Sequence, residues 1–158
     1  MTTGSEAPSP PSPSRRHLYL LLGAVMYIAL LIAGLGITSL FLDADVINTD
    51  GFGQLPGAVG VVASTLAWAA IVAPALRGRG SLGAAVLAGV IAAAAYCLGV
   101  FVTAIVVGAD LAVAASAVSR LVTLGFALVI AIAGVFAATG ALVAVRSSGG
   151  TARWPWEK

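Results

Sequence analysis

The chain has 158 residues, of which 60% are hydrophobic and 9% are charged, and its formal net charge is +2. So few charged residues cannot give its long apolar segments a polar face, which excludes a water-soluble globular domain. The chain is also too short to carry a second folded domain beside those segments. Its basic residues are not interleaved with aromatic residues as in single-strand-binding proteins, so no nucleic-acid partner is expected.

The first 17 residues are predicted to form a disordered cytoplasmic tail. Between Thr2 and Ser14 this tail consists of Ser, Thr, Gly, Ala and Pro with one Glu, and its prolines oppose regular structure. Arg15 and Arg16 then precede an apolar run, as the paired arginines of a twin-arginine export signal do. A cleavable signal has an apolar core of about 7–15 residues, which this run exceeds, so a membrane span is the favoured interpretation.

Four apolar runs are each long enough to cross a bilayer as a helix. They cover residues 18–42, 56–76, 81–108 and 119–145. A helix that rises about 1.5 Å per residue needs about 20 residues to cross a hydrocarbon core of about 30 Å. The predicted fold class is therefore all-α, a four-helix transmembrane bundle (18–145) in a lipid bilayer.

The distribution of charge predicts how the bundle is oriented. Most of the basic residues lie in the N-terminal tail, the second loop or the C-terminal tail, namely Arg15, Arg16, Arg77, Arg79, Arg146, Arg153 and Lys158. The first loop carries Asp43, Asp45 and Asp50, and the third carries Asp110. Because Lys and Arg concentrate in cytoplasmic loops, both termini are expected to be cytoplasmic.

Small residues mark the helix faces that are expected to pack. Ala85, Gly89, Ala93 and Cys97 recur at every fourth position of the third run, and Gly134 and Ala138 lie on a similar face of the fourth. Small residues at this spacing let helices approach closely within a bilayer. The third and fourth spans are therefore predicted to cross closely. In the alternative, one of these faces is exposed and forms a homo-oligomer.

The apolar runs contain few groups that could carry chemistry. No Asp, Glu, His or Lys lies in the middle of a run, and the sequence contains no metal-ligand spacing and no catalytic set. Coupled transport, catalytic residues, cofactors and bound metals are therefore not expected, and the protein is predicted not to be an enzyme. The hydroxyls within the runs are expected to donate to carbonyls of their own helices; they belong to Ser64, Thr65, Thr103, Thr123 and Thr139.

Arg120 departs from the charge pattern because it lies at the outer end of the fourth run, ten residues after Asp110. In the favoured interpretation its side chain extends to the outer headgroups and pairs loosely with Asp110 or with a lipid phosphate. In the alternative, Arg120 faces inward and binds an anionic lipid or substrate at the mouth of the bundle.

The C-terminal segment, residues 146–158, ends in the most distinctive motif of the chain. After a Ser- and Gly-rich spacer come Arg153, Trp154, Pro155, Trp156 and Glu157. Pro155 restricts the backbone beside both indoles, which suits a short peptide that docks into a groove of a partner protein. Tryptophan also prefers the membrane interface, so the tail could instead anchor there.

The four spans, the preference for Arg over Lys and the Arg-Trp-Pro-Trp-Glu ending resemble small uncharacterised membrane proteins of actinobacteria. This resemblance implies a multi-pass protein of a bacterial plasma membrane and no particular activity. The function predicted from the sequence is that of a non-enzymatic accessory or assembly subunit, which binds a membrane-protein partner or a second copy of itself. The alternative is a small oligomeric channel or facilitator with Arg120 at its outer mouth.

Overall fold

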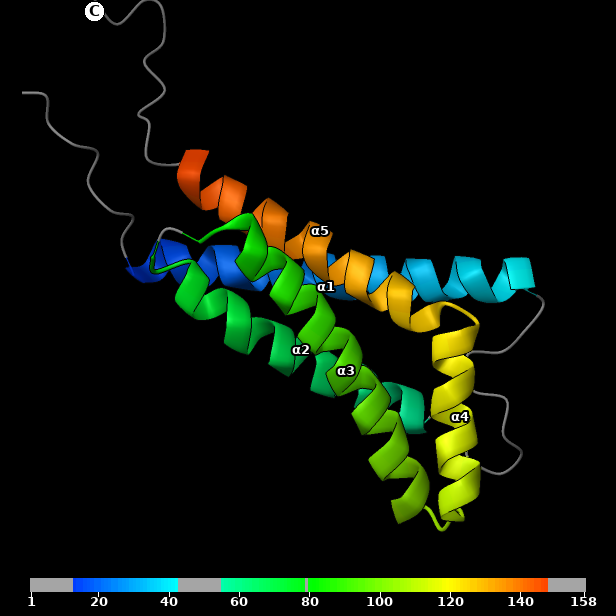
Figure 1. The fold of residues 1–158 in the computed structure, drawn as a ribbon. Coiled ribbons are helices and arrows are strands. Elements are labelled where there is room, and N and C mark those ends of the chain that lie inside the picture. Colours follow the sequence, from blue (N-terminus) through cyan, green and yellow to red (C-terminus); the bar gives the residue numbers. More distant parts are fainter. Residues whose placement is uncertain (1–12, 43–54, 79, 148–158) are drawn as a thin grey trace, which may run out of the picture.

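The computed structural model describes residues 13–42, 55–78 and 80–147, which form five helices (Figure 1). Where the connecting residues are described, the connections are short turns. The helices are α1 (Pro13–Leu42), α2 (Leu55–Ala75), α3 (Leu82–Val106), α4 (Leu111–Thr123) and α5 (Phe126–Ser147). All except α4 are long and apolar enough to cross a membrane. The all-α class is confirmed, with one more helix than the sequence predicts.

The first helix starts earlier than predicted. It begins at Pro13 rather than at Leu18, so residues 13–17 are helical and the prediction of a disordered tail is wrong for them. Proline is tolerated at the first helical position because the N–H that it lacks would have no partner there. The rest of that predicted tail, residues 1–12, lies outside the described residues.

Helices α2 and α3 form a hairpin and share the most extensive interface of the bundle (Figure 1). Two glycines bring the helix backbones together, since a Cβ on Gly99 would lie only 3.1 Å from the Cα of Gly60. This tight hairpin agrees with the very short loop between the second and third predicted spans.

A glycine ends α3 earlier than the predicted boundary at residue 108. Gly108 has a φ of +100°, a conformation that glycine adopts without steric cost. The amides of Gly108 and Ala109 donate to the carbonyls of Ile105 and Ala104, both at 3.0 Å. This pair of bonds is a Schellman motif, which satisfies the last carbonyls of the helix.

The fourth predicted span, residues 119–145, is not one continuous helix. The chain breaks at Leu124 and Gly125, so that α4 supplies the first part of this range and α5 the rest. Gly125 has a φ of +82°, which ends α4, and its carbonyl accepts from the amides of Leu128 and Val129 at the start of α5. The span that remains in α5 has 22 residues, or about 33 Å of helix, which is sufficient to cross the hydrocarbon core.

Helix α4 differs from the four long helices in direction and in character. It runs from the end of α3 to the start of α5 at a steep angle to α1 (Figure 1) and contacts both of its neighbours in the chain. Ala114 and Leu121 are buried, whereas its polar residues are exposed; these are Ser116, Ser119, Arg120 and Thr123. An amphipathic helix of this kind suits the boundary between lipid and water.

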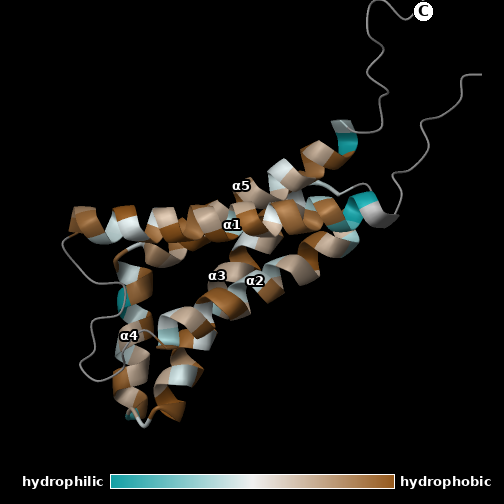
Figure 2. Cartoon of the chain, turned by 180° about the vertical axis from the view of Figure 1, so that it is seen from behind, coloured by the Kyte–Doolittle hydropathy of each residue, from teal (hydrophilic) through white to brown (hydrophobic). Residues whose placement is uncertain are grey.

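Aromatic side chains from different helices fill the centre of the bundle. Tyr27 of α1, Trp68 of α2, Tyr96 of α3 and Phe126 of α5 are all at most 2% exposed. The rings of Tyr27 and Trp68 are stacked, with centroids 5.6 Å apart and planes at 2°. The outer faces instead expose large aliphatic side chains, as a lipid-facing surface requires. Figure 2 shows that hydrophobic residues predominate along the long helices.

Several Ser and Thr hydroxyls donate hydrogen bonds to carbonyls of their own helices. Ser64 and Thr65 donate to the carbonyl of Val61 at 2.9 and 2.7 Å, and Thr103 donates to Gly99 at 2.7 Å. On α4, Thr123 donates to Ser119 at 2.9 Å. The predicted return bonds are therefore confirmed for these four residues.

Candidate functional site

The beginning of α1, the α2–α3 turn and the end of α5 meet at one end of the bundle, here called the basic end (Figure 1). The described basic residues there are Arg15, Arg16, Arg77 and Arg146. The first described residue of α1 and the last of α5 both lie at this end, so the chain enters and leaves the bundle there. The sequence predicts that it faces the cytoplasm.

The turn at the basic end is held by backbone bonds and by α5. Arg77 and Gly78 donate their amides to the carbonyl of Pro74 at 3.0 and 3.3 Å, which continues α2 into the turn. The Arg146 guanidinium then donates to the carbonyl of Gly80. Gly80 must be small, because a Cβ there would lie 2.5 Å from Cδ2 of Leu142 and 2.8 Å from the carbonyl oxygen of Ala75.

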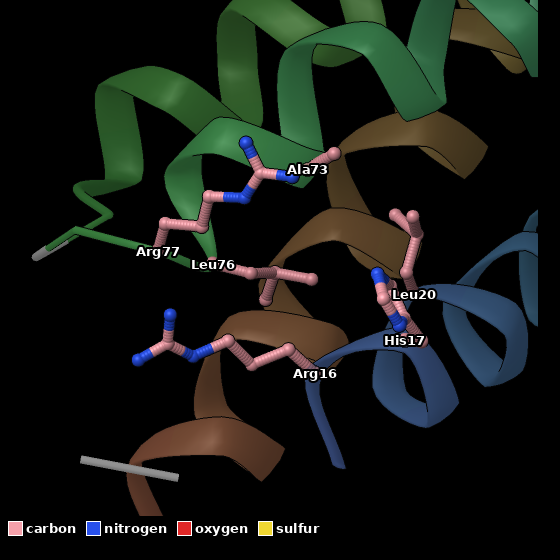
Figure 3. Close-up of a pocket in the computed structure, with 6 residues that line it drawn as sticks. All are labelled: Arg16, His17, Leu20, Ala73, Leu76 and Arg77. Atoms are coloured by element: carbon pink, nitrogen blue, oxygen red, sulfur yellow. The ribbon is translucent and has the colours of Figure 1, made fainter. Parts of the chain in front are cut away.

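A pocket of about 350 Å³ opens at the basic end between the start of α1 and the end of α2 (Figure 3). It is lined by Arg16, His17, Leu20, Ala73, Leu76 and Arg77. Arg16 is half-buried, whereas His17 and Arg77 are exposed. Figure 3 shows the two guanidinium groups on either side of Leu76, with the imidazole of His17 beside Leu20.

The pocket has cationic groups and no acidic group among its described lining residues. Nε of Arg16 is buried and has no hydrogen-bond acceptor within the described part of the chain. The lining side chains are guanidinium, imidazole or aliphatic. This arrangement can receive an anion, since none of the described lining residues carries a carboxylate that would repel one.

The sequence identified Arg16, His17 and Arg77 only as residues that flank the spans. The charge pattern indicates the side of the membrane on which they lie, but not that α1 and α2 bring them around a shared cavity. The position of Arg16, one helical turn ahead of Leu20, was the available signal, because it places a cation directly above an apolar side chain on the same helix face.

The residues predicted to pack the third and fourth spans lie on α3 and α5. Gly89 and Gly134 face one another, and a Cβ on Gly134 would lie 2.8 Å from the Cα of Gly89. A Cβ on Gly89 would collide with the carbonyl oxygen of Ala131 and would lie 2.7 Å from Cγ2 of Val135. Ala85 and Ala138 are buried, and Ala93 is half-buried against the same core. These small faces are therefore occupied within a single chain.

The sequence did not single out Trp68, which makes the most informative polar contact of the core. Its indole N–H donates to the carbonyl of Gly134 at 3.0 Å, in a fully buried position. A cavity for the ring exists because Gly23 lacks a side chain; a Cβ there would lie 2.8 Å from Cη2 of Trp68. A tryptophan in the middle of an apolar run was the signal, since its N–H needs an acceptor in the absence of water.

Arg120 and Asp110 lie near opposite ends of α4 and are both exposed. The ten residues between them correspond to about 15 Å of helix, so the expected loose ion pair is not formed. Asp110 is the N-cap of α4, although its side chain makes no capping bond. Arg120 is therefore free to contact lipid or solvent. Neither Arg120 nor Asp110 lines the pocket at the basic end.

The tail motif, Arg153 to Glu157, lies outside the described residues. Within the described ranges, no group of three or more His, Cys, Asp or Glu residues could hold a metal ion. Cys97 is a free, half-buried thiol of α3.

Comparison with known proteins identifies a family. The model of DUF6121, a family of unknown function, matches residues 15–158. No curated protein and no solved structure matches the chain. The matched region includes all of the C-terminal tail and leaves out the first 14 residues.

Proposed function

The chain belongs to DUF6121, a family of unknown function, and we propose that it is a non-enzymatic accessory or assembly subunit of a complex in a bacterial plasma membrane. In this proposal both termini are cytoplasmic and the C-terminal tail, through Arg153 to Glu157, docks onto a membrane-protein partner. The function concerns binding rather than conversion of a substrate.

The observation that carries this proposal is the gathering of helix ends at the basic end. α1 begins there, α5 ends there, and the α2–α3 turn is bonded to Arg146 between them. A tail that begins at this braced end starts from a fixed point, which lowers the entropic cost of presenting a peptide to a partner. All described arginines except Arg120 also gather there, which favours a cytoplasmic orientation.

The packing of the core supports partner binding over a pore. Trp68, Tyr27 and Tyr96 fill the centre of the bundle. The hydroxyls of Ser64, Thr65 and Thr103 donate to carbonyls of their own helices. A channel would therefore have to form between copies of the chain. The small faces that could have joined such copies, around Gly89 and Gly134, are used internally.

Comparative affinity purification from native membranes in mild detergent tests the proposal. The full chain is compared with a chain that ends at Thr151 and with the double variant Trp154→Ala/Trp156→Ala. A control variant, Ser148→Ala/Thr151→Ala, changes the spacer and retains both indoles. We expect a stoichiometric membrane protein to accompany the full chain and the spacer variant and to be lost from the other two.

A different pair of results would contradict the proposal. If the purified chain alone, reconstituted in liposomes, moves a solute across the bilayer, it is a channel or facilitator and not an accessory subunit. If a partner is retained equally by all four chains, the tail is not the docking element.

A further inference from the structure

The pocket between α1 and α2 presents cationic and apolar groups in two layers. Along their helices, Arg16 and Arg77, here called the cationic layer, lie one turn nearer the basic end than Leu20 and Ala73. Figure 3 shows the guanidinium groups of Arg16 and Arg77 on either side of Leu76, with that of Arg77 beside Ala73. Because Leu20 belongs to the apolar part of α1, the cationic layer lies where an apolar span gives way to its flanking residues. This is the depth at which phospholipid headgroups lie.

The cationic layer lacks a counter-charge in the described structure. Neither Arg16 nor Arg77 forms an ion pair with a described residue, and the buried Nε–H of Arg16 has no acceptor. A buried donor without a partner is costly, and a cation at the edge of a low-dielectric bilayer attracts an anion more strongly than it would in water. The site is therefore incomplete without an anionic acceptor.

A phosphate group meets these requirements best. Its oxygens accept hydrogen bonds from a guanidinium in the bidentate manner that arginine favours, and its charge complements two arginines. The pocket volume of about 350 Å³ exceeds what a single phosphate needs and leaves room for the group to which the phosphate is esterified. The aliphatic floor of the pocket suits an esterified, partly apolar ligand rather than a free ion.

α1 contacts α5 extensively and α2 less. Below the pocket, Trp68 of α2 stacks on Tyr27 of α1 and lies against Gly23, which closes the seam between the two helices. A ligand would therefore reach the pocket at the basic end, at the level of the headgroups. We propose that this pocket binds the phosphate group of an anionic phospholipid, through Arg16 and Arg77, at the basic end of the bundle. This proposal is independent of the docking role of the tail.

Binding of short-chain lipids to the purified full chain in neutral detergent tests the proposal. The probes are dihexanoyl phosphatidylglycerol, dihexanoyl phosphatidylcholine and inorganic phosphate, each titrated by calorimetry and followed by native mass spectrometry. We expect saturable binding of one phosphatidylglycerol per chain and much weaker binding of phosphatidylcholine, whose headgroup carries no net charge.

Three variants locate the site. Arg16→Gln and Arg77→Gln are each expected to weaken phosphatidylglycerol binding about tenfold, as loss of a charge-assisted bond to phosphate implies. Arg15→Gln is the matched control, because it removes the same charge from the adjacent, exposed position and is expected to change binding less than about twofold. A further variant, Arg16→Lys, keeps the charge but removes the Nε–H donor, and is expected to give an intermediate loss.

The outcomes separate the sources of the anion. Inorganic phosphate could bind as tightly as the lipid and be weakened by the same substitutions. In that case the pocket is an anion site whose ligand is free phosphate, and the lipid proposal is overturned. If Arg15→Gln weakens binding as much as Arg16→Gln does, the attraction is only general surface charge and the pocket assignment is wrong. Binding that appears only after residues 152–158 are removed would mean that the tail occupies the pocket, which would also overturn the proposal.

Discussion

The indole N–H of Trp68 on α2 donates to the carbonyl oxygen of Gly134 on α5 at 3.0 Å, while the indole ring stacks on Tyr27 of α1. A single side chain thus joins helices α1, α2 and α5. Gly134 also packs directly against Gly89 of α3. The hydrogen bond from Trp68 is therefore made at a point where α3 and α5 approach each other very closely.

Trp68→Phe should destabilise the bundle by about 1 kcal/mol, since a hydrogen bond between membrane helices contributes about that much and the aromatic stack is retained. Trp68→Ala should cost about 3–5 kcal/mol because it also leaves a large cavity. The free energy of unfolding, measured by denaturant titration in mixed micelles, checks both values. Leu66→Ala, on the exposed face of α2, is the control and should change that free energy little. Equal effects of Trp68→Phe and Trp68→Ala would show that the ring contributes nothing beyond its N–H.

Gly89→Ala should destabilise the bundle by about 1–3 kcal/mol, because the added methyl group meets the backbone of α5 and cannot be relieved by a side-chain rotation. Gly36→Ala on α1 is the matched control, since no described atom beyond its chain neighbours and the nearby backbone of its own helix lies within 4 Å of the added methyl group. That control should be neutral or stabilising by up to about 1 kcal/mol, as alanine is the better helix former. Both variants can be compared by thermal unfolding in one detergent, and a Gly89→Ala protein as stable as the Gly36→Ala protein would rule out the close crossing.

Gly125→Ala should lower the free energy of unfolding by about 1–2 kcal/mol, because a φ of +82° is unfavourable for any residue with a Cβ. Apart from the chain neighbours, no described atom lies within 4 Å of the added methyl group, so crowding would not be the cause. Gly125→Asn should cost less, since asparagine tolerates the left-handed region. Gly78→Ala provides the control, as its surroundings are equally open and its φ is not in that region. The measurement is again the free energy of unfolding; if both alanine variants behave alike, α4 and α5 are not separated by a left-handed residue.

Cysteine labelling of intact cells tests the orientation. In a Cys97→Ala background, Ser116→Cys on α4 should react with a membrane-impermeant maleimide added outside, whereas Ser147→Cys at the end of α5 should react only after lysis. Both positions are exposed, so accessibility in the folded chain does not decide the result. Labelling of Ser147→Cys in intact cells would reverse the proposed topology.

Arg120→Ala should leave stability within about 0.5 kcal/mol of the parent protein, because Arg120 is exposed and forms no ion pair with a described residue. It should also cause no change in solute flux through liposomes that contain the chain. A flux that depends on Arg120 would favour the channel alternative.

The number of long helices could be predicted because each is an unbroken apolar run of sufficient length. The break at Gly125 could not, since glycine is common within transmembrane helices and its sequence context gives no indication of a positive φ. The small residues of α3 and α5 were informative because their spacing is periodic. The placement of Arg16 one turn ahead of Leu20 could be read from the sequence, but the pocket that Arg16 forms with Arg77 could not. The charge pattern shows at which end of each helix the arginines lie, but not which helices pack beside each other.

Helix α4 has a mechanical consequence as the connection between α3 and α5. A flexible loop would let the outer ends of these two helices approach each other, whereas 13 helical residues form a strut of about 20 Å. At the opposite end, Arg146 and Gly80 tie α5 directly to the α2–α3 turn. The helices therefore form a wedge, narrow at the basic end and wide where α4 lies (Figure 1), and in a bilayer it would displace more lipid from one leaflet than from the other.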